Sequence, residues 1–205
     1  MTTYHRFVFN ESERRFVGDF EAMYQAETVE KFDSWHQDDE HRLDLNITSA
    51  LVRSVEPETV LDIGSGKGLL VAMISSSGRR IIGSDVSQTA LETARERNPS
   101  ASFVHIPDSS LDSLQHLLRL SKEQLGVIDL VLCSQVLSYI ENWELLVQEI
   151  FEHSKSICVS LYVPENPIGY VKSWDNVCTA VQAHSNIKSS LWDSAGRTGY
   201  LLATR

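Results

Sequence analysis

Short apolar runs alternate with helical patterns along most of the chain, from Thr59 onward. Within the runs, apolar and polar residues do not alternate, which is typical of strands that are buried on both faces. We expect strands at residues 59–63, 80–85, 102–106, 127–133 and 156–163, and helices at roughly 67–77, 87–97, 110–124, 142–154 and 170–184. This order predicts an α/β fold, with helices on both faces of a mainly parallel sheet.

Two regions depart from this alternation. After residue 184, the runs NIKSSLWDS and TGYLLATR flank Ala195-Gly196-Arg197, which predicts an antiparallel hairpin. At the other end, the first 58 residues are too apolar for a disordered tail. There we expect a short extended piece, a helix around 11–27, a loop over 31–39 and a second helix at 40–55. Aromatic residues are dense in this part: Tyr4, Phe7, Phe9, Phe16, Phe20, Tyr24, Phe32 and Trp35.

Bulk properties narrow the class of protein. A chain of 205 residues is too short to make two enzyme domains probable, so we expect a single domain over residues 1–205. The net charge of -10 opposes attraction to nucleic acid or to an anionic bilayer, so we expect neither partner. The start of the chain lacks the features of a signal peptide, and no apolar run approaches the roughly 18 residues of a membrane span. These patterns favour a cytoplasmic location.

A glycine-rich loop carries the clearest chemical signal. The stretch VLDIGSGKGLL at 60–70 places Gly64, Gly66 and Gly68 between a strand and a helix, where the backbone turns tightly and approaches a ligand. The pattern is not a P-loop, because Lys67 is followed by glycine rather than serine or threonine. The dinucleotide pattern would need a third glycine where the chain has Leu69. Asp85, at the end of the next strand, is placed to bond ribose hydroxyls.

The spacing D-x-G-x-G-x-G that begins at Asp62 resembles motif I of class I S-adenosylmethionine-dependent methyltransferases. The resemblance implies a Rossmann-like three-layer sandwich, with a seven-stranded, mostly parallel sheet and a C-terminal antiparallel hairpin. It also implies that Asp62 lies near the amino group of the cofactor and that Asp85 holds the ribose. Residues 1–40 are similar to the N-terminal segment of small methyltransferases associated with bacterial polysaccharide or sugar modification, and would form a lid.

The same resemblance supplies the remaining site residues. Either Asp108 or Ser109 would reach the adenine amino group. Many relatives have an acid where this chain has Gln135. The predicted cofactor residues are Asp62, Gly64, Ser65, Gly66, Gly68, Asp85, Val86, Asp108, Ser109, Ser134, Gln135 and Val136, and the predicted substrate or lid residues are Tyr24, Trp35, Tyr139 and Tyr162.

No residue emerges as the catalytic group. His36 and Tyr139 are weak candidates, and methyl transfer needs positioning more than acid–base help. The run from His36 to His41 invites a metal interpretation, but its two histidines would point to different faces of a helix, so we expect no metal.

We therefore expect methyl transfer from S-adenosylmethionine to an oxygen or nitrogen of a small polar acceptor, with a sugar or glycan precursor as one candidate. The product of the cofactor would be S-adenosylhomocysteine. Two alternatives stay open: a nicotinamide-dependent oxidoreductase and a non-catalytic nucleoside-binding protein of the same fold. The sequence does not define the oligomeric state.

Overall fold

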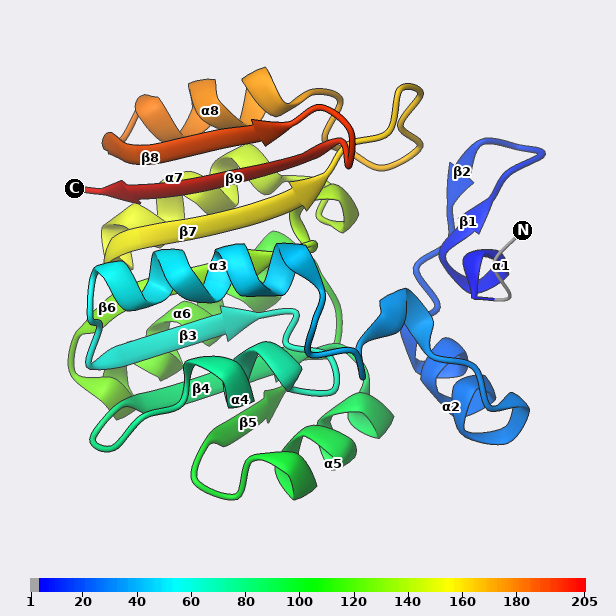
Figure 1. Cartoon of the computed structure of the whole chain (residues 1–205), viewed down its shortest axis with the longest axis horizontal. Coiled ribbons are helices and arrows are strands. Elements are labelled where there is room, and N and C mark those ends of the chain that lie inside the picture. The colour runs from blue at the N-terminus through cyan, green and yellow to red at the C-terminus, as the bar shows by residue number, and fades with distance from the viewer. Residues whose placement is uncertain (1–3) are drawn as a thin grey trace.

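A seven-stranded sheet forms the centre of the computed structural model, which describes residues 4–205 (Figure 1). Its order is β5-β4-β3-β6-β7-β9-β8; β9 is antiparallel to both of its neighbours, and the other pairs are parallel. The strands are β3 (Thr59–Ile63), β4 (Arg80–Asp85), β5 (Ser102–His105), β6 (Ile128–Ser134), β7 (Ser154–Tyr162), β8 (Asn186–Asp193) and β9 (Thr198–Thr204). The predicted fold class, including the C-terminal hairpin, is confirmed.

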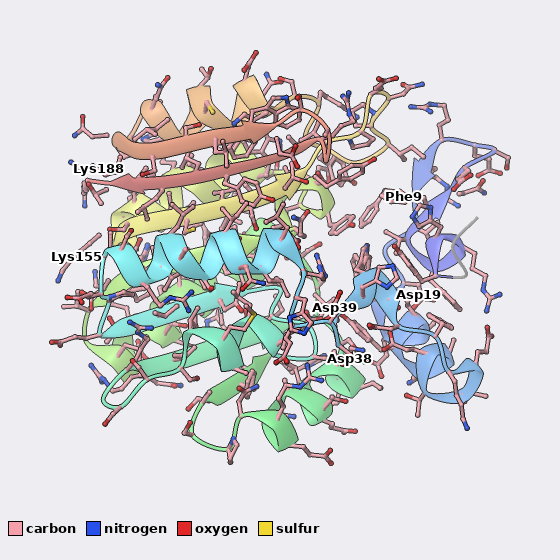
Figure 2. The ribbon with its side chains drawn as sticks, in the orientation of Figure 1. Phe9, Asp19, Asp38, Asp39, Lys155 and Lys188 are labelled. Atoms are coloured by element: carbon pink, nitrogen blue, oxygen red, sulfur yellow. The ribbon has the colours of Figure 1, made fainter. Side chains whose placement is uncertain are left out.

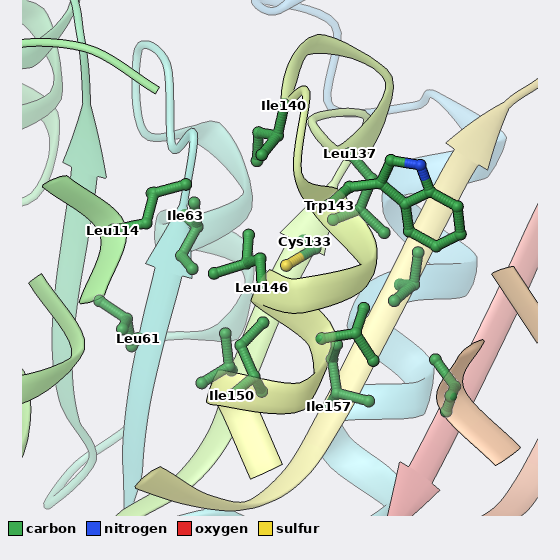
Figure 3. Close-up of a cluster of buried hydrophobic side chains, with 14 of the residues drawn as sticks. Leu61, Ile63, Leu114, Cys133, Leu137, Ile140, Trp143, Leu146, Ile150 and Ile157 are labelled. Carbon is green, nitrogen blue, oxygen red and sulfur yellow. The ribbon is translucent and has the colours of Figure 1, made fainter. Parts of the chain in front are cut away.

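Helices cover both faces of this sheet. They are α3 (Leu43–Ser54), α4 (Leu69–Ile74), α5 (Gln88–Arg97), α6 (Leu111–Leu125), α7 (Trp143–His153) and α8 (Trp174–Gln182). One core cluster joins α6, α7 and α8 to one face, and Figure 3 shows Leu146 and Ile150 of α7 lying near Ile157 of β7. A second cluster joins α3 and α4 to the other face. Because both faces are covered, every residue of β3 is buried, as the unalternating sequence predicts.

Local capping fixes several helix starts. The Ser87 hydroxyl accepts a hydrogen bond from the Ala90 N–H and so caps α5, as predicted. Ser110 caps α6 through the Ser113 N–H. The last helix begins later than expected, because Ser173 caps it through the Asn176 N–H and α8 starts at Trp174.

The prediction of a helix over residues 11–27 is wrong in its first half. Residues 4–36 form α1 (His5–Val8), the short strands β1 (Phe9–Asn10) and β2 (Arg15–Phe16), α2 (Phe20–Glu30) and the 3-10 turn η1 (Ser34–His36). The two strands pair with each other in an antiparallel hairpin. Gly18, at φ +72°, then redirects the chain, and the Asp19 carboxylate caps α2 by accepting from the Ala22 N–H at 3.2 Å. These two residues set the helix start at Phe20.

This N-terminal segment lies beyond the carboxyl ends of the parallel strands, to the right of the sheet in Figure 1. Its centre is a third core cluster, in which Val8, Met23 and Tyr24 pack with Ala90 of α5. Partly buried aromatic rings surround them, and the Phe16 and Tyr139 rings stack with centroids 5.6 Å apart. The aromatic residues that are dense in the sequence therefore attach this segment to the sheet edge.

Within residues 4–205, none of the helices combines the length and the apolar character that crossing a bilayer requires.

Candidate functional site

The strand order reverses between β3 and β6, and the loops that follow these two strands enclose a pocket. In open parallel sheets, such a switch point leaves a crevice at the carboxyl ends of the strands. The glycine loop follows β3, and Gln135 follows β6. The N-terminal segment closes the third side, because Phe20, Tyr24 and Trp35 also line the pocket.

The glycine loop cannot adopt its shape with ordinary side chains. Gly64, Gly66 and Gly68 all have positive φ angles, of 74°, 53° and 76°. A Cβ atom on Gly66 would lie 2.2 Å from Oε1 of Gln37. A Cβ atom on Gly68 would instead meet the side chains of Asn98 and Ala94. Gly66 therefore leaves room for the Gln37 side chain at the pocket wall, whereas Gly68 allows close packing of α4 on α5.

Two carboxylates are buried in the pocket wall. Asp85 is 8% exposed, and its oxygens accept from the Gly66 N–H and the Ser87 N–H, both at 2.9 Å. Asp62 is 1% exposed, and its Oδ1 has no hydrogen-bond partner among residues 4–205. Burial, and then the charge of Asp85, raises the pKa of Asp62 from 3.8 to about 8. Burial also raises the pKa of Asp85, although its backbone hydrogen bonds act in the other direction.

Most of the predicted residues meet at this pocket. Those that line it are Tyr24, Trp35, Asp62, Gly64, Ser65, Gly66, Asp85, Val86, Ser109, Ser134, Gln135, Val136 and Tyr139. Two predicted cofactor residues, Gly68 and Asp108, are not in the lining. Asp108 is exposed, and its carboxylate accepts from the Ser110 N–H and the Ser113 hydroxyl at the start of α6. Of the two alternatives for the adenine contact, the structure brings only Ser109 to the pocket.

The pocket also contains residues that the sequence analysis did not single out, above all Gln37 and Arg42. Arg42 donates to Asp44 through Nε at 3.0 Å and through Nη2, and its Nη1 donates to the Trp35 carbonyl. Nothing in the sequence distinguishes Arg42 from the chain's other arginines. The remaining additions are Phe20 and the mainly aliphatic wall of Leu45, Ile63, Leu69, Leu70, Ile106, Leu114 and Ile140.

A second cavity, of about 350 Å³, adjoins the first. Trp35, Arg42, Gln135 and Tyr139 line both. The other lining residues of the second cavity are Tyr4, His36, Asp39, Asp44, Ser138, Leu161, Tyr162 and Thr198. Two of the predicted residues, His36 and Tyr162, therefore lie at this cavity and not at the first pocket.

Gln135 divides the two cavities in an unusual conformation. Its φ is +59°, which few residues other than glycine adopt. Three contacts hold it there: its N–H donates to the Ser160 carbonyl at 2.7 Å, its Oε1 accepts from the Tyr162 N–H at 2.7 Å, and its Nε2 lies 3.4 Å from Asp44. Non-glycine residues with such φ angles persist only where the surrounding structure holds them despite the strain, and they cluster at binding sites.

Comparison with known proteins finds a methyltransferase domain in this chain. The profile of a family described as "Methyltransferase domain" matches residues 61–156, which include the glycine loop and Asp85. The N-methyltransferase NodS from Bradyrhizobium japonicum WM9, solved with S-adenosylhomocysteine, is 16% identical with a TM-score of 0.66, over 89% of this chain and 97% of that chain. Residues 61–156 therefore belong to a methyltransferase domain, and the chain has the fold of S-adenosylmethionine-dependent methyltransferases.

Other solved methyltransferases share the fold at similarly low identity. Magnesium protoporphyrin IX methyltransferase (ChlM) from Synechocystis PCC 6803, with bound S-adenosylhomocysteine, is 17% identical with a TM-score of 0.61, over 83% of each chain. The N-terminal domain of EvdMO1, in the presence of S-adenosylhomocysteine and D-fucose, is 15% identical with a TM-score of 0.58, over 82% of this chain and 84% of that chain. No curated protein matches this methyltransferase in sequence.

The first pocket fits the cofactor of this family. S-adenosylmethionine carries an ammonium group, a carboxylate, ribose hydroxyls and a flat adenine ring. The pocket offers an unpartnered buried carboxylate oxygen on Asp62, a second carboxylate on Asp85 and an apolar wall that includes Ile106. The Ser65 hydroxyl is also buried without a partner among the described residues. Unpaired polar atoms in a pocket wall are typical of a site that a polar ligand completes.

Proposed function

We propose that this methyltransferase binds S-adenosylmethionine in the first pocket and transfers its methyl group to an oxygen or nitrogen of a small polar acceptor in the second cavity. One observation carries the proposal: the Asp62 carboxylate is buried beside the glycine loop, and no cation among residues 4–205 pairs with it. A buried carboxylate is costly unless it is paired or protonated. A ligand ammonium would supply the missing charge.

Each part of the cofactor has a counterpart in the pocket wall. We assign the amino group to Asp62 and the ribose hydroxyls to Asp85. Among the described lining residues, Arg42 is the only lysine or arginine, so it is our candidate partner for the cofactor carboxylate. Val86, Ile106 and Ser109 also line the pocket and would surround the adenine ring.

The second cavity would hold the acceptor, because it meets the first pocket at Trp35, Gln135 and Tyr139. Its wall combines aromatic rings with an arginine, two aspartates and a histidine, which suits a polar molecule with an apolar face. The structural neighbours include a porphyrin methyltransferase, an N-methyltransferase and a domain studied with D-fucose. The molecules named with these neighbours differ in chemical class, so they do not define one acceptor. The domain solved in the presence of D-fucose supports a sugar precursor as a candidate acceptor.

The cofactor supplies an electrophilic methyl group when it is bound, and the residues of the chain act mainly by position. Tyr139 lies between the two cavities, and burial raises the pKa of its phenol, so it would donate a hydrogen bond to the acceptor rather than act as a base. His36 lies at the second cavity and is our candidate to accept the proton that an acceptor hydroxyl or ammonium loses. Trp35 and Tyr24 would exclude water, as parts of an N-terminal lid over residues 1–40.

Thermal unfolding with candidate ligands tests this function. We expect S-adenosylhomocysteine at 100 times its dissociation constant to add about 2.7 kcal/mol of stability, and NADH at the same concentration to add none. Stabilisation by NADH alone would favour a nicotinamide-dependent oxidoreductase. Binding of S-adenosylhomocysteine without turnover of S-adenosylmethionine across sugars, amines and small hydroxyl compounds would favour a non-catalytic nucleoside-binding protein.

A further inference from the structure

Lys67 belongs to the glycine loop, yet its side chain does not line the cofactor pocket. Only 7% of the side chain is exposed. Its Nζ donates to three carboxylates: Glu27 at 2.5 Å, Asp33 at 2.9 Å and Asp38 at 2.7 Å. All three acids belong to the N-terminal segment, so the central lysine of the loop binds the proposed lid.

The three acids also shape the backbone of the segment that carries them. The second oxygen of Glu27 accepts from the Ser34 N–H at 3.1 Å. Asp33 accepts from the Gln37 N–H at 2.9 Å and from the Asp38 N–H at 3.0 Å. The turn between α2 and α3 is thus folded around the Lys67 ammonium. The carboxylate oxygens lie within 4.8 Å of one another, and such close anions need a cation.

The charge balance shows that the ammonium is firmly held. Burial lowers the pKa of Lys67, but hydrogen bonds to Asp38, Glu27 and Asp33 outweigh it and raise the pKa above its usual value. Lys67 and Arg97 together lower the pKa of Asp38 against the effect of its own burial, and Arg97 lies 2.7 Å from that carboxylate. Removing the cation from such a cluster is destabilising, because the remaining carboxylates are left uncompensated.

A neutral contact joins the same two elements. The Lys67 N–H donates to Oε1 of Gln37 at 3.1 Å, and Nε2 of Gln37 donates to the Tyr24 hydroxyl at 2.7 Å. Gln37 and Tyr24 both line the cofactor pocket. The segment therefore contacts the main chain of the glycine loop as well as the lysine side chain.

The fastened segment supplies walls to both cavities. Tyr24, Trp35 and Gln37 line the first, and Trp35, His36 and Asp39 line the second. Asp39 follows Asp38 directly, and His36 lies between Asp33 and Asp38. Figure 2 shows Asp38 and Asp39 on the side of the N-terminal segment that faces the sheet, while Phe9 and Asp19 lie farther from the sheet. A movement of the acids away from Lys67 would therefore displace residues of the acceptor cavity.

We infer that Lys67 is a positioning residue that clamps the segment 20–39 onto the glycine loop, so that the cofactor loop and the wall of the acceptor cavity take their working positions together. This role rests on the proposed function, since it assigns the two cavities to cofactor and acceptor. In a P-loop, the corresponding lysine contacts phosphate groups. In this chain, the ion pairs to Glu27, Asp33 and Asp38 occupy its ammonium instead.

Hydrogen exchange of the full chain tests the clamp, with S-adenosylhomocysteine as the probe. In Lys67→Met, we expect backbone amides of residues 20–39 to exchange about tenfold faster or more without ligand, while the strands of the sheet keep their protection. In the wild-type protein, S-adenosylhomocysteine should slow exchange in this segment further. In the variant, bound ligand should no longer do so. Lys67→Arg retains the charge and should restore both effects.

Controls keep the outcomes distinct. Lys155→Met removes another lysine–aspartate pair, Lys155 with Asp129 at 2.7 Å, at the opposite end of the molecule (Figure 2), and should change nothing in residues 20–39. If Lys67→Met does not fold, the variant that adds Glu27→Gln and Asp38→Asn removes the cation together with two of its three anions. Unchanged exchange of residues 20–39 in a folded Lys67 variant would overturn the clamp. Failure of the wild type to bind the probe would overturn the proposed function, while the ligand-free comparison would still decide the clamp.

Discussion

Two groups of carboxylates lie beside the glycine loop, and among residues 4–205 only one group pairs with a lysine or arginine. Glu27, Asp33 and Asp38 share the Lys67 ammonium. Asp62 and Asp85 are buried in the pocket wall, where Asp85 has backbone N–H donors and Asp62 keeps one oxygen without a partner. A carboxylate that finds its cation within the chain serves the structure. One that is buried without a cation indicates where a charged ligand belongs.

The same comparison separates the two acid groups by pKa. The pKa of Asp38 is lowered, because Lys67 and Arg97 stabilise its charged form more than burial opposes it. The pKa of Asp62 is raised to about 8, because burial and Asp85 both oppose its charge. Perturbed carboxylates of the second kind are enriched at functional sites.

The largest expected effect comes from the residue between the two groups. Gly66→Val should weaken binding of S-adenosylhomocysteine by more than about 100-fold, because the side chain would enter the space beside the pocket that Gln37 and Tyr24 already border. The strain at φ +53° should also lower the melting temperature by several degrees. Calorimetric titration and thermal unfolding measure the two effects.

Gly78→Val is the matched control. Gly78 has φ +87°, but a Cβ there would meet nothing within 4 Å. It should therefore lose stability while keeping its affinity for the ligand. Equal affinity in Gly66→Val and the wild type would show that the pocket does not use this face of the loop.

Asp85→Ala should come next. The loss of its acceptors leaves ribose hydroxyls unpaired, which should cost about 2–3 kcal/mol, or about 30- to 150-fold in the affinity for S-adenosylhomocysteine. Asp129→Ala is the control, because Asp129 also binds backbone N–H groups, those of Glu58 and Thr59, but lies outside the pocket lining. A folded Asp85→Ala protein with wild-type affinity would remove Asp85 from the cofactor site.

The raised pKa of Asp62 predicts that both ligand affinity and stability depend on pH. Ligand binding needs the charged carboxylate, so affinity for S-adenosylhomocysteine should rise with pH up to about 8, by as much as about tenfold per unit. Between pH 3.8 and about 8, the ligand-free folded state holds a proton that the unfolded chain has released. The contribution of Asp62 to the free energy of unfolding of the ligand-free protein therefore falls as the pH rises from 3.8 to about 8.

Asp62→Asn separates the two consequences. It should flatten the pH dependence of affinity and weaken binding at pH 8, yet raise the melting temperature of the ligand-free protein at that pH, because the amide has no charge to bury. Titrations and unfolding curves from pH 6 to 8.5 measure both. A variant with the wild-type pH profile would mean that Asp62 does not meet the ligand ammonium.

The smallest effects concern the adenine end. Ser109→Ala should reduce affinity by about 0.5–1.5 kcal/mol, because Ser109 lines the pocket. Asp108→Ala should leave affinity unchanged and cost about 1 kcal/mol of stability, since Asp108 accepts from the Ser110 N–H and the Ser113 hydroxyl next to the cap of α6. The opposite ranking in parallel titrations would restore Asp108 as the adenine contact.

The site residues that the sequence predicts correctly are those whose position depends on neighbouring residues in the chain. The glycine loop and Asp85 could be predicted because apolar runs define two strands: the loop follows the first, and Asp85 ends the second. Parallel strands bring their carboxyl ends together at one edge of the sheet. Asp108 illustrates the limit: it is adjacent to Ser109, but its side chain turns toward Ser110 and Ser113. The spacing of residues along the sequence does not show which of two adjacent loop residues points into the pocket.

The N-terminal segment was the hardest part to predict. The predicted helix start was wrong because the true start depends on the positive φ of Gly18 and on the capping carboxylate of Asp19, within an apolar, aromatic stretch that also fits a helix. Gln37 and Lys67 are 30 positions apart, and their contact depends on how the segment folds back over the sheet. The available signals were the excess of acids at Asp33, Asp38 and Asp39 and, about 30 positions later, a glycine-loop lysine that does not fit a P-loop.

The position of β9 has a consequence for how the protein folds as it is synthesised. Among the described strands, β8 pairs only with β9, and β9 fills the gap between β7 and β8. The five parallel strands can assemble in the order in which they leave the ribosome, but β8 emerges before its partner exists. Leu191 and Trp192 of β8 therefore stay in an unpaired strand until β9 has been synthesised. A chain that ended just before Thr198 would leave the edge of β7 unpaired and prone to association.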